Sequence, residues 1–201
     1  MLRVATFLVL VSVAACGSDT TGTKVDVAGS TALTWGQGSY GVVLAHGATR
    51  NAASWEEQAT AMAEQGATVL AVEDISPALI ADAVRQLQED GIEDVALVGG
   101  SAGADAILRL AAAEPNLPDQ LILLSPNSMV EGLGDQPKLF IASEEEPVAD
   151  VSRRLAESSP GEDNKVVVLP GSAHAQGIFE SDEGERTTTL LLHRLAKYAD
   201  R

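Results

Sequence analysis

The sequence predicts an α/β protein with a doubly wound, mostly parallel sheet covered by helices on both faces. Apolar, β-branched runs alternate with helical patterns along most of the chain. The runs are continuously apolar rather than alternating, as in parallel strands that are buried on both faces. They occupy residues 41–46, 67–73, 94–100, 120–125, 138–143 and 165–170, and a short antiparallel hairpin is expected before them at 24–35.

Helical patterns fill the segments between these strands and carry capping signals. Residues 54–66 begin with Ser54 as the expected N-cap and Glu57 as its capping-box partner, and they end at a glycine. Residues 76–91 begin with a serine and a proline and also end at a glycine. Further helices are expected at 102–114, 147–158 and 186–199. Because residues 126–137 are too few to form a lid domain, we expect an open site.

Composition limits the classes of function. At 201 residues the chain has room for one well-buried domain. Its single cysteine excludes an intrachain disulfide and any zinc or iron–sulfur site built from several thiolates. A net charge of −16 gives a surface that repels nucleic acid, so no nucleic-acid partner is expected. Neither a metal nor an organic cofactor is implied.

The N-terminus is typical of a secretory signal. Arg3 precedes an apolar run that is too short for a comfortable membrane span and that ends in small residues. The final residues, Val-Ala-Ala-Cys at 13–16, resemble the lipobox of bacterial lipoproteins, in which the cysteine thiol carries a diacylglyceryl group. The alternative is an ordinary cleaved signal with an incidental cysteine. We predict a lipoprotein signal peptide at 1–16 ending at lipidated Cys16, a flexible tether at 17–23, and a single domain at 24–201 held on the outer face of the cytoplasmic membrane.

A lone serine stands where the strand at 94–100 turns into a helix. Residues 99–103, Gly-Gly-Ser-Ala-Gly, match Gly-x-Ser-x-Gly, the nucleophile elbow, whose tight turn requires small neighbours. A phosphate-binding loop is the competing interpretation. It needs Gly-x-Gly-x-x-Gly or a Gly-Lys-Ser/Thr ending, and the segment has neither. Ser101 is therefore the predicted nucleophile, and the helix that follows offers N–H groups to an oxyanion.

A nucleophilic serine needs a base, and the base needs an orienting acid. His174 lies in the loop immediately after the strand at 165–170, at the same carboxyl edge of the sheet as the nucleophile. We therefore predict His174 as the base. His46 ends an earlier strand and is expected to be structural, while His193 lies inside the last helix and is expected to be a partly buried packing residue.

Three successive glutamates at 144–146 follow the strand before the base. They could be solvated charges near a helix start, which favours anions. One of them could instead orient His174, giving the chain order serine, acid, histidine. Glu146 precedes Pro147, which restricts it to an extended backbone. Glu145 and Asp150 stay open as alternative acids.

From about residue 24 to residue 199 the chain resembles a compact α/β-hydrolase, close to the dienelactone-hydrolase and small-carboxylesterase branch. The segment HGATRNAASW at 46–55 resembles the family's His-Gly oxyanion segment, and PGSAH at 170–174 resembles the segment that bears the base. The sequence SEEEP at 143–147 stands where the family has Gly-x-x-Asp-Pro, so Glu146 falls on the acid position. Dienelactone hydrolases proper use a cysteine nucleophile, and Ser101 moves the chain away from that particular activity.

The resemblance implies an oxyanion hole formed by the backbone N–H of Ala102 and that of Ala48 or Gly47. It also implies a serine hydrolase that cleaves small carboxylic esters through an acyl-enzyme on Ser101, with His174 as base and Glu146 as orienting acid. Two alternatives remain open: a non-catalytic lipoprotein that uses the fold as a binding module, and an acyltransferase in which an alcohol replaces water.

Overall fold

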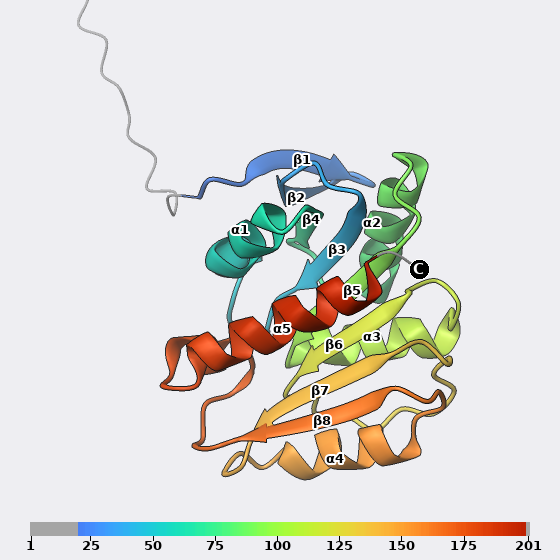
Figure 1. Cartoon of the computed structure of the whole chain (residues 1–201). Helices are drawn as coiled ribbons and strands as arrows, with labels where there is room; N and C mark the ends of the chain where they lie inside the picture. Colours follow the sequence, from blue (N-terminus) through green and yellow to red (C-terminus); the bar gives the residue numbers. More distant parts are fainter. Residues whose placement is uncertain (1–19, 200–201) are drawn as a thin grey trace, which may run out of the picture.

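One mixed sheet of eight strands runs through residues 20–199, the part of the chain that the computed structural model describes (Figure 1). Its strands lie in the order β1-β2-β4-β3-β5-β6-β7-β8. The pairs β1–β2 and β2–β4 are antiparallel, and the remaining pairs are parallel. The predicted mostly parallel sheet with an N-terminal hairpin is thus confirmed. The strands are β1 Thr23–Val27, β2 Ser30–Trp35, β3 Tyr40–Ala45, β4 Ala67–Val72, β5 Val95–Gly100, β6 Gln120–Leu124, β7 Lys138–Ser143 and β8 Asn164–Leu169.

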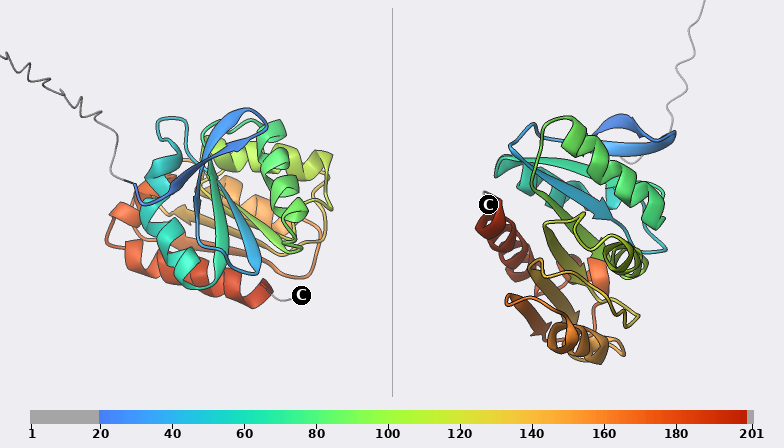
Figure 2. Two further views of the ribbon diagram at one scale, coloured as in Figure 1. Left: turned by 90° about the horizontal axis from the view of Figure 1, so that it is seen from above. Right: turned by 90° about the vertical axis from the view of Figure 1, so that its right-hand side faces the viewer.

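Helices cover both faces of the sheet (Figure 2). The sheet divides the apolar core into two layers. Apolar side chains of α1 and α5 pack on one face, and those of α2, α3 and α4 pack on the other. The strands between them are almost completely buried, which explains their continuously apolar sequences. The helices are η1 Ala52–Trp55, α1 Glu56–Glu64, α2 Pro77–Glu89, α3 Ala102–Ala113, α4 Ala149–Ser158, η2 Ala175–Glu180 and α5 Gly184–Tyr198, of which η1 and η2 are 3₁₀ turns.

The capping signals were correct for one helix and wrong for another. The Ser76 side chain accepts a hydrogen bond from Leu79 N at 3.3 Å, as expected for the N-cap of α2. Ser54 was expected to cap α1, but α1 follows the 3₁₀ turn η1 directly and has no side-chain cap; the capping side chain is that of Asn51 at the start of η1, whose Oδ1 accepts from Ser54 N at 3.1 Å. Asparagine is as good an N-cap as serine, and the Ser54 hydroxyl instead accepts from Gln176 Nε2 at 2.7 Å.

An ion-pair cluster attaches the C-terminal helix α5 to the start of β8. Asp163 accepts from Arg194 Nη1 at 2.9 Å and from Lys197 Nζ at 2.6 Å. Hydrogen bonding to Lys197, together with Arg194, lowers the pKa of the Asp163 carboxyl to about 2. The cluster therefore depends on an ionised Asp163.

No helix covers the carboxyl edge of the sheet between β6 and β7, because residues 125–137 contain neither helix nor strand. Within residues 20–199, none of the helices has the length and apolar character needed to cross a membrane. The predicted signal peptide and Cys16 lie outside the described residues.

Candidate active site

Ser101 occupies a strained turn between β5 and α3. Its φ of 52° and ψ of −112° are unusual for a residue with a side chain. A Cβ added to Gly99 would lie 2.7 Å from Ile107 Cδ1, and one added to Gly103 would lie 2.2 Å from Ala45 O. The glycines around Ser101 therefore allow the start of α3 to pack directly against the strands beside it.

Three of the predicted site residues meet at the carboxyl edge of the sheet. His174 Nε2 lies 2.8 Å from Ser101 Oγ, and His174 Nδ1 lies 2.6 Å from Glu146 Oε2. Ser101 follows β5, Glu146 follows β7 and His174 follows β8. The carboxyl ends of these strands lie at the same edge of the sheet because the strands are parallel. The Glu146 side chain is 2% exposed and that of His174 is 44% exposed, so the acid is buried while solvent reaches the imidazole.

The Glu146 carboxylate is held by donors on both of its oxygens. Besides its contact with His174, its Oε1 accepts from Ser143 N at 2.7 Å and from Ser125 Oγ at 2.8 Å. The two alternative acids are placed differently. Glu145 is exposed, and Asp150 is exposed in the first turn of α4, where it pairs with a nearby arginine. Of the three carboxylates, Glu146 is the one in contact with the imidazole.

Ser125 is a component of the site that the sequence analysis did not identify. It is fully buried just past the end of β6, where its hydroxyl accepts from Ala175 N at 2.9 Å and donates to Glu146. Its φ is 49°, and that of Ala175 is 51°. Of the four described non-glycine residues with positive φ, Ser101 belongs to the Ser101–His174–Glu146 group and Ser125 and Ala175 lie next to it, and such clustering is typical of functional sites.

The two predicted oxyanion segments flank Ser101, but their N–H groups differ in availability. Gly47 N donates to Gln176 Oε1 at 2.9 Å. Within residues 20–199, the N–H groups of Ala48 and Ala102 have no protein acceptor. Of the alternatives Ala48 and Gly47, the structure thus leaves Ala48 free to donate, and it commits Gly47 to the glutamine.

The other two histidines lie apart from this group. His46 is buried, with Nδ1 2.8 Å from Gly47 O and Nε2 3.1 Å from Glu73 O, so its ring braces the loop after β3. His193 is exposed on α5 rather than partly buried as expected. Among the described residues, neither ring makes a hydrogen bond to Ser101, and His174 is the histidine that does.

An ion pair links the loop after β3, which carries Ala48, to the 3₁₀ turn η2, which follows His174. Arg50, in the loop after β3, donates to Glu180 of η2 at 2.6 Å. This hydrogen bond and the positive charge of Arg50 lower the pKa of the Glu180 carboxyl below its usual value. Both side chains are partly exposed to solvent, so the pair contributes little to the stability of the fold.

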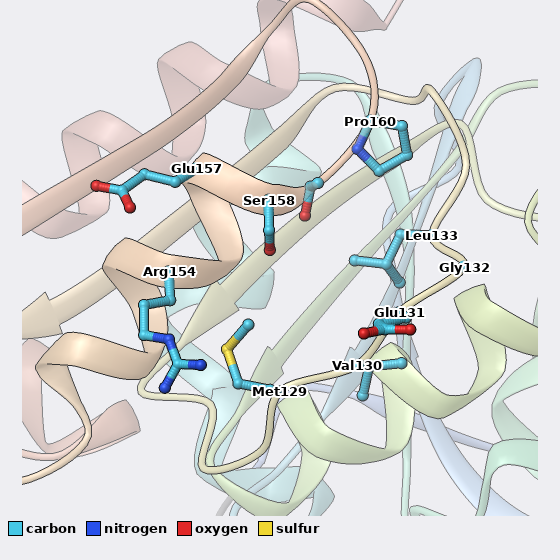
Figure 3. Close-up of a pocket in the computed structure, with 10 residues that line it drawn as sticks. Met129, Val130, Glu131, Gly132, Leu133, Arg154, Glu157, Ser158 and Pro160 are labelled. Atoms are coloured by element: carbon cyan, nitrogen blue, oxygen red, sulfur yellow. The ribbon is translucent and has the colours of Figure 1, made fainter.

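A separate groove of about 740 Å³ lies between α4 and the segment that leads from β6 to β7 (Figure 3). Met129, 38% exposed, and Leu133 lie on one side of it, and Arg154 and Glu157 of α4 lie on the other. None of the residues of the Ser101–His174–Glu146 group lines it.

Within residues 20–199, no three His, Cys, Asp or Glu side chains are grouped so as to hold a metal ion.

The sheet order, the turn at Ser101 after β5, and the positions of Glu146 and His174 after β7 and β8 are those of the α/β-hydrolase fold. No protein-family model and no curated protein matches the sequence. Solved structures with this fold do match the chain. An esterase of the bacterial hormone-sensitive lipase family superposes with a TM-score of 0.77 at 17% identity, covering 91% of this chain and 86% of that one.

Two further structures extend the likeness. Dienelactone hydrolase from Anabaena variabilis has a TM-score of 0.70 at 18% identity, covering 90% of this chain and 98% of that one. The monoacylglycerol lipase of Paleococcus ferrophilus has a TM-score of 0.67 at 14% identity, covering 83% and 98%. At these identities the comparisons show the fold, and the chain has the α/β-hydrolase fold.

Proposed function

We propose that this protein is a serine hydrolase that cleaves small carboxylic esters through an acyl-enzyme on Ser101. The observation that carries the proposal is the continuous line of hydrogen bonds from Ser101 through His174 to the buried Glu146. The fold supports it, because proteins of the same fold include an esterase and a monoacylglycerol lipase.

The chemistry follows from the positions of these atoms. Ser101 Oγ attacks the ester carbonyl carbon while its proton passes to His174 Nε2. Glu146 accepts the Nδ1–H of the ring, which fixes the tautomer and stabilises the imidazolium. The N–H groups of Ala102 and Ala48 donate to the oxyanion. His174 then protonates the leaving alkoxide, and water repeats the sequence to release the acid and restore the Ser101 hydroxyl.

The substrate class is inferred from the exposure of the site. With no helix between β6 and β7 and with a half-exposed His174, the edge that carries Ser101 is open to solvent. Such an edge suits short, soluble acyl esters better than long acyl chains, which need an enclosing apolar wall.

Hydrolysis of p-nitrophenyl acetate by the wild type and three variants tests the proposal. Ser101→Ala and His174→Ala should lose several orders of magnitude in kcat, while His193→Ala, on the exposed face of α5, serves as the matched control and should keep wild-type activity. An active His174→Ala together with an inactive His193→Ala would show that the base is assigned wrongly. Adding an alcohol measures how the acyl group partitions between water and an acceptor, which separates the hydrolase from an acyltransferase.

We also propose that the protein is a bacterial lipoprotein, anchored through Cys16 on the outer face of the cytoplasmic membrane. The described chain begins by docking on the domain, because Thr21 N donates to Glu56 Oε1 at 3.1 Å. Thr20 lies four residues after Cys16, so fully extended chain between them spans at most about 14 Å. The catalytic domain would then stay close to the lipid surface.

Fractionation of cells tests the anchor. Cys16→Ser should release the protein from the membrane fraction or leave an unprocessed precursor. A Cys16→Ser protein that remains membrane-bound after removal of its signal would contradict the lipid anchor.

A further inference from the structure

A side-chain amide reaches the nucleophile from the loop after β6. Asn127 Nδ2 lies 3.3 Å from Ser101 Oγ, and Asn127 is otherwise exposed to solvent. The serine oxygen therefore has two polar neighbours, the His174 imidazole and the Asn127 amide. The mechanism derived above uses only the first of them.

Asp105 holds the Asn127 amide in place. Its carboxylate accepts from Asn127 N at 2.8 Å, from Asn127 Nδ2 at 3.0 Å and from Ser128 N at 3.1 Å. Asp105 lies in the first turn of α3, where the helix dipole favours a negative charge, and its own N–H donates to Ser101 O at 2.9 Å. Asp105 and Asn127 thus form a clamp, and this clamp is anchored in the first turn of α3, directly after Ser101.

The chemistry of the clamp fixes which end of the amide faces the serine. An ionised carboxylate can only accept hydrogen bonds, so the NH₂ group of Asn127 must face Asp105. The same NH₂ group then directs its second N–H toward Ser101 Oγ. In this position Asn127 is a donor to the reacting oxygen.

The position of Asn127 distinguishes it from an oxyanion donor. The loop with Ala48 follows β3, on one side of β5, whereas Asn127 follows β6, on the other side. The acid and base follow β7 and β8, which lie beyond β6. Asn127 therefore approaches Ser101 from the side of the base, and the atom it contacts is the serine oxygen itself.

We propose that Asn127 is a catalytic residue that stabilises negative charge on Ser101 Oγ, and that Asp105 is its positioning residue. The inference rests on the proposed function. In acylation the Oγ–H bond breaks, its proton goes to His174 Nε2, and the Oγ–C bond forms. In deacylation the Oγ–C bond breaks, and Oγ takes the proton back from His174. In acylation Oγ carries more negative charge in the transition state than in the ground-state hydroxyl, and in deacylation it carries more than in the ester of the acyl-enzyme. A donor to Oγ therefore lowers both barriers.

Rates of acylation and turnover test the proposal. Asn127→Ala should slow both labelling by a fluorophosphonate and kcat on p-nitrophenyl acetate about tenfold, the effect of one neutral hydrogen bond, with KM little changed. Ser128→Ala is the matched control, because the Ser128 side chain makes no hydrogen bond among the described residues, and its rates should equal those of the wild type.

Two isosteric variants separate catalysis from folding. Asn127→Asp replaces the donor by an acceptor beside Asp105, so it should be slower than Asn127→Ala at neutral pH. Asp105→Asn leaves the Asn127 amide unoriented and should lower kcat without changing KM. Both Asn127 variants should unfold in urea near the wild-type midpoint, because Asn127 is exposed.

The outcomes distinguish this inference from the proposed function. If the wild type is not labelled at all, the proposed function fails and the role of Asn127 fails with it. If the wild type is labelled and active but Asn127→Ala and Asn127→Asp match it in labelling rate and kcat, the role of Asn127 alone is refuted. A loss of activity that parallels a loss of folded protein in both variants would also refute it.

Discussion

Replacing Glu146 by glutamine should reverse the tautomer of the base. The Glu146 carboxylate accepts from Ser143 N and Ser125 Oγ on one oxygen and from His174 Nδ1 on the other. Glutamine has a single acceptor oxygen, and the backbone N–H of Ser143 can only donate, so the amide oxygen stays on that side. The amide NH₂ then faces His174 and donates to Nδ1. The ring proton must therefore lie on Nε2, the nitrogen that faces Ser101 Oγ. An imidazole in that tautomer cannot take the serine proton.

The expected loss of kcat is large because the donors around residue 146 do not allow the glutamine amide to turn its oxygen toward His174. Loss of the correct tautomer in a serine triad lowers kcat by up to about 10⁴-fold, or roughly 5.4 kcal/mol in the barrier. The assay is kcat on p-nitrophenyl acetate, with Glu145→Gln as control, because that neighbouring side chain is exposed. Near-normal kcat in Glu146→Gln would refute the reasoning. A large loss in Glu145→Gln instead would move the acid by one residue.

Three further predictions concern the scaffold. Ser125→Ala should lower the free energy of unfolding by about 2–4 kcal/mol. Ser125→Gly should lower it by about 1 kcal/mol less than Ser125→Ala does, because glycine tolerates a φ of 49°. Equal unfolding free energies of the two variants in urea would refute the backbone strain at this residue. Gly103→Ala should cost at least about 3 kcal/mol by driving α3 off β3, while Gly177→Ala, with open space, should change stability by less than about 0.5 kcal/mol. Asp163 has a lowered pKa, so its stabilisation is complete above the ordinary carboxyl range and is lost as pH falls toward 2. Asp163→Asn should therefore be less stable than the wild type at pH 6, and the difference should shrink near pH 2; a difference independent of pH would contradict the ion-pair account.

The fold could be predicted because each central strand is buried on both faces and therefore reads as an uninterrupted apolar run. The elbow was visible for a related reason. Gly99 and Gly103 approach neighbouring atoms so closely that the small residues are required locally. His174 and the glutamates could be placed at the same edge as Ser101 because parallel strands put their following loops together. Choosing Glu146 among three adjacent carboxylates needed the family pattern, since local sequence does not show which one is buried.

The parts that were missed depend on contacts between residues distant in sequence. Ser125 reads as the last residue of an apolar strand, and nothing near it indicates a hydroxyl shared between Glu146 and Ala175 N. Gln176 takes the N–H of Gly47 across 129 positions, so sequence could not choose between Gly47 and Ala48. The wrong cap at Ser54 has the same cause, because its hydroxyl is used by Gln176.

Intact-mass measurement after exposure to a fluorophosphonate tests the central claim most directly, since it reports whether Ser101 is an activated nucleophile without requiring the natural ester. The account predicts one covalent adduct on the wild type, mapped by peptide analysis to Ser101, and none on Ser101→Ala. A folded wild type that takes up no adduct, or an adduct that persists in Ser101→Ala, would contradict the claim that Ser101, His174 and Glu146 form a catalytic group.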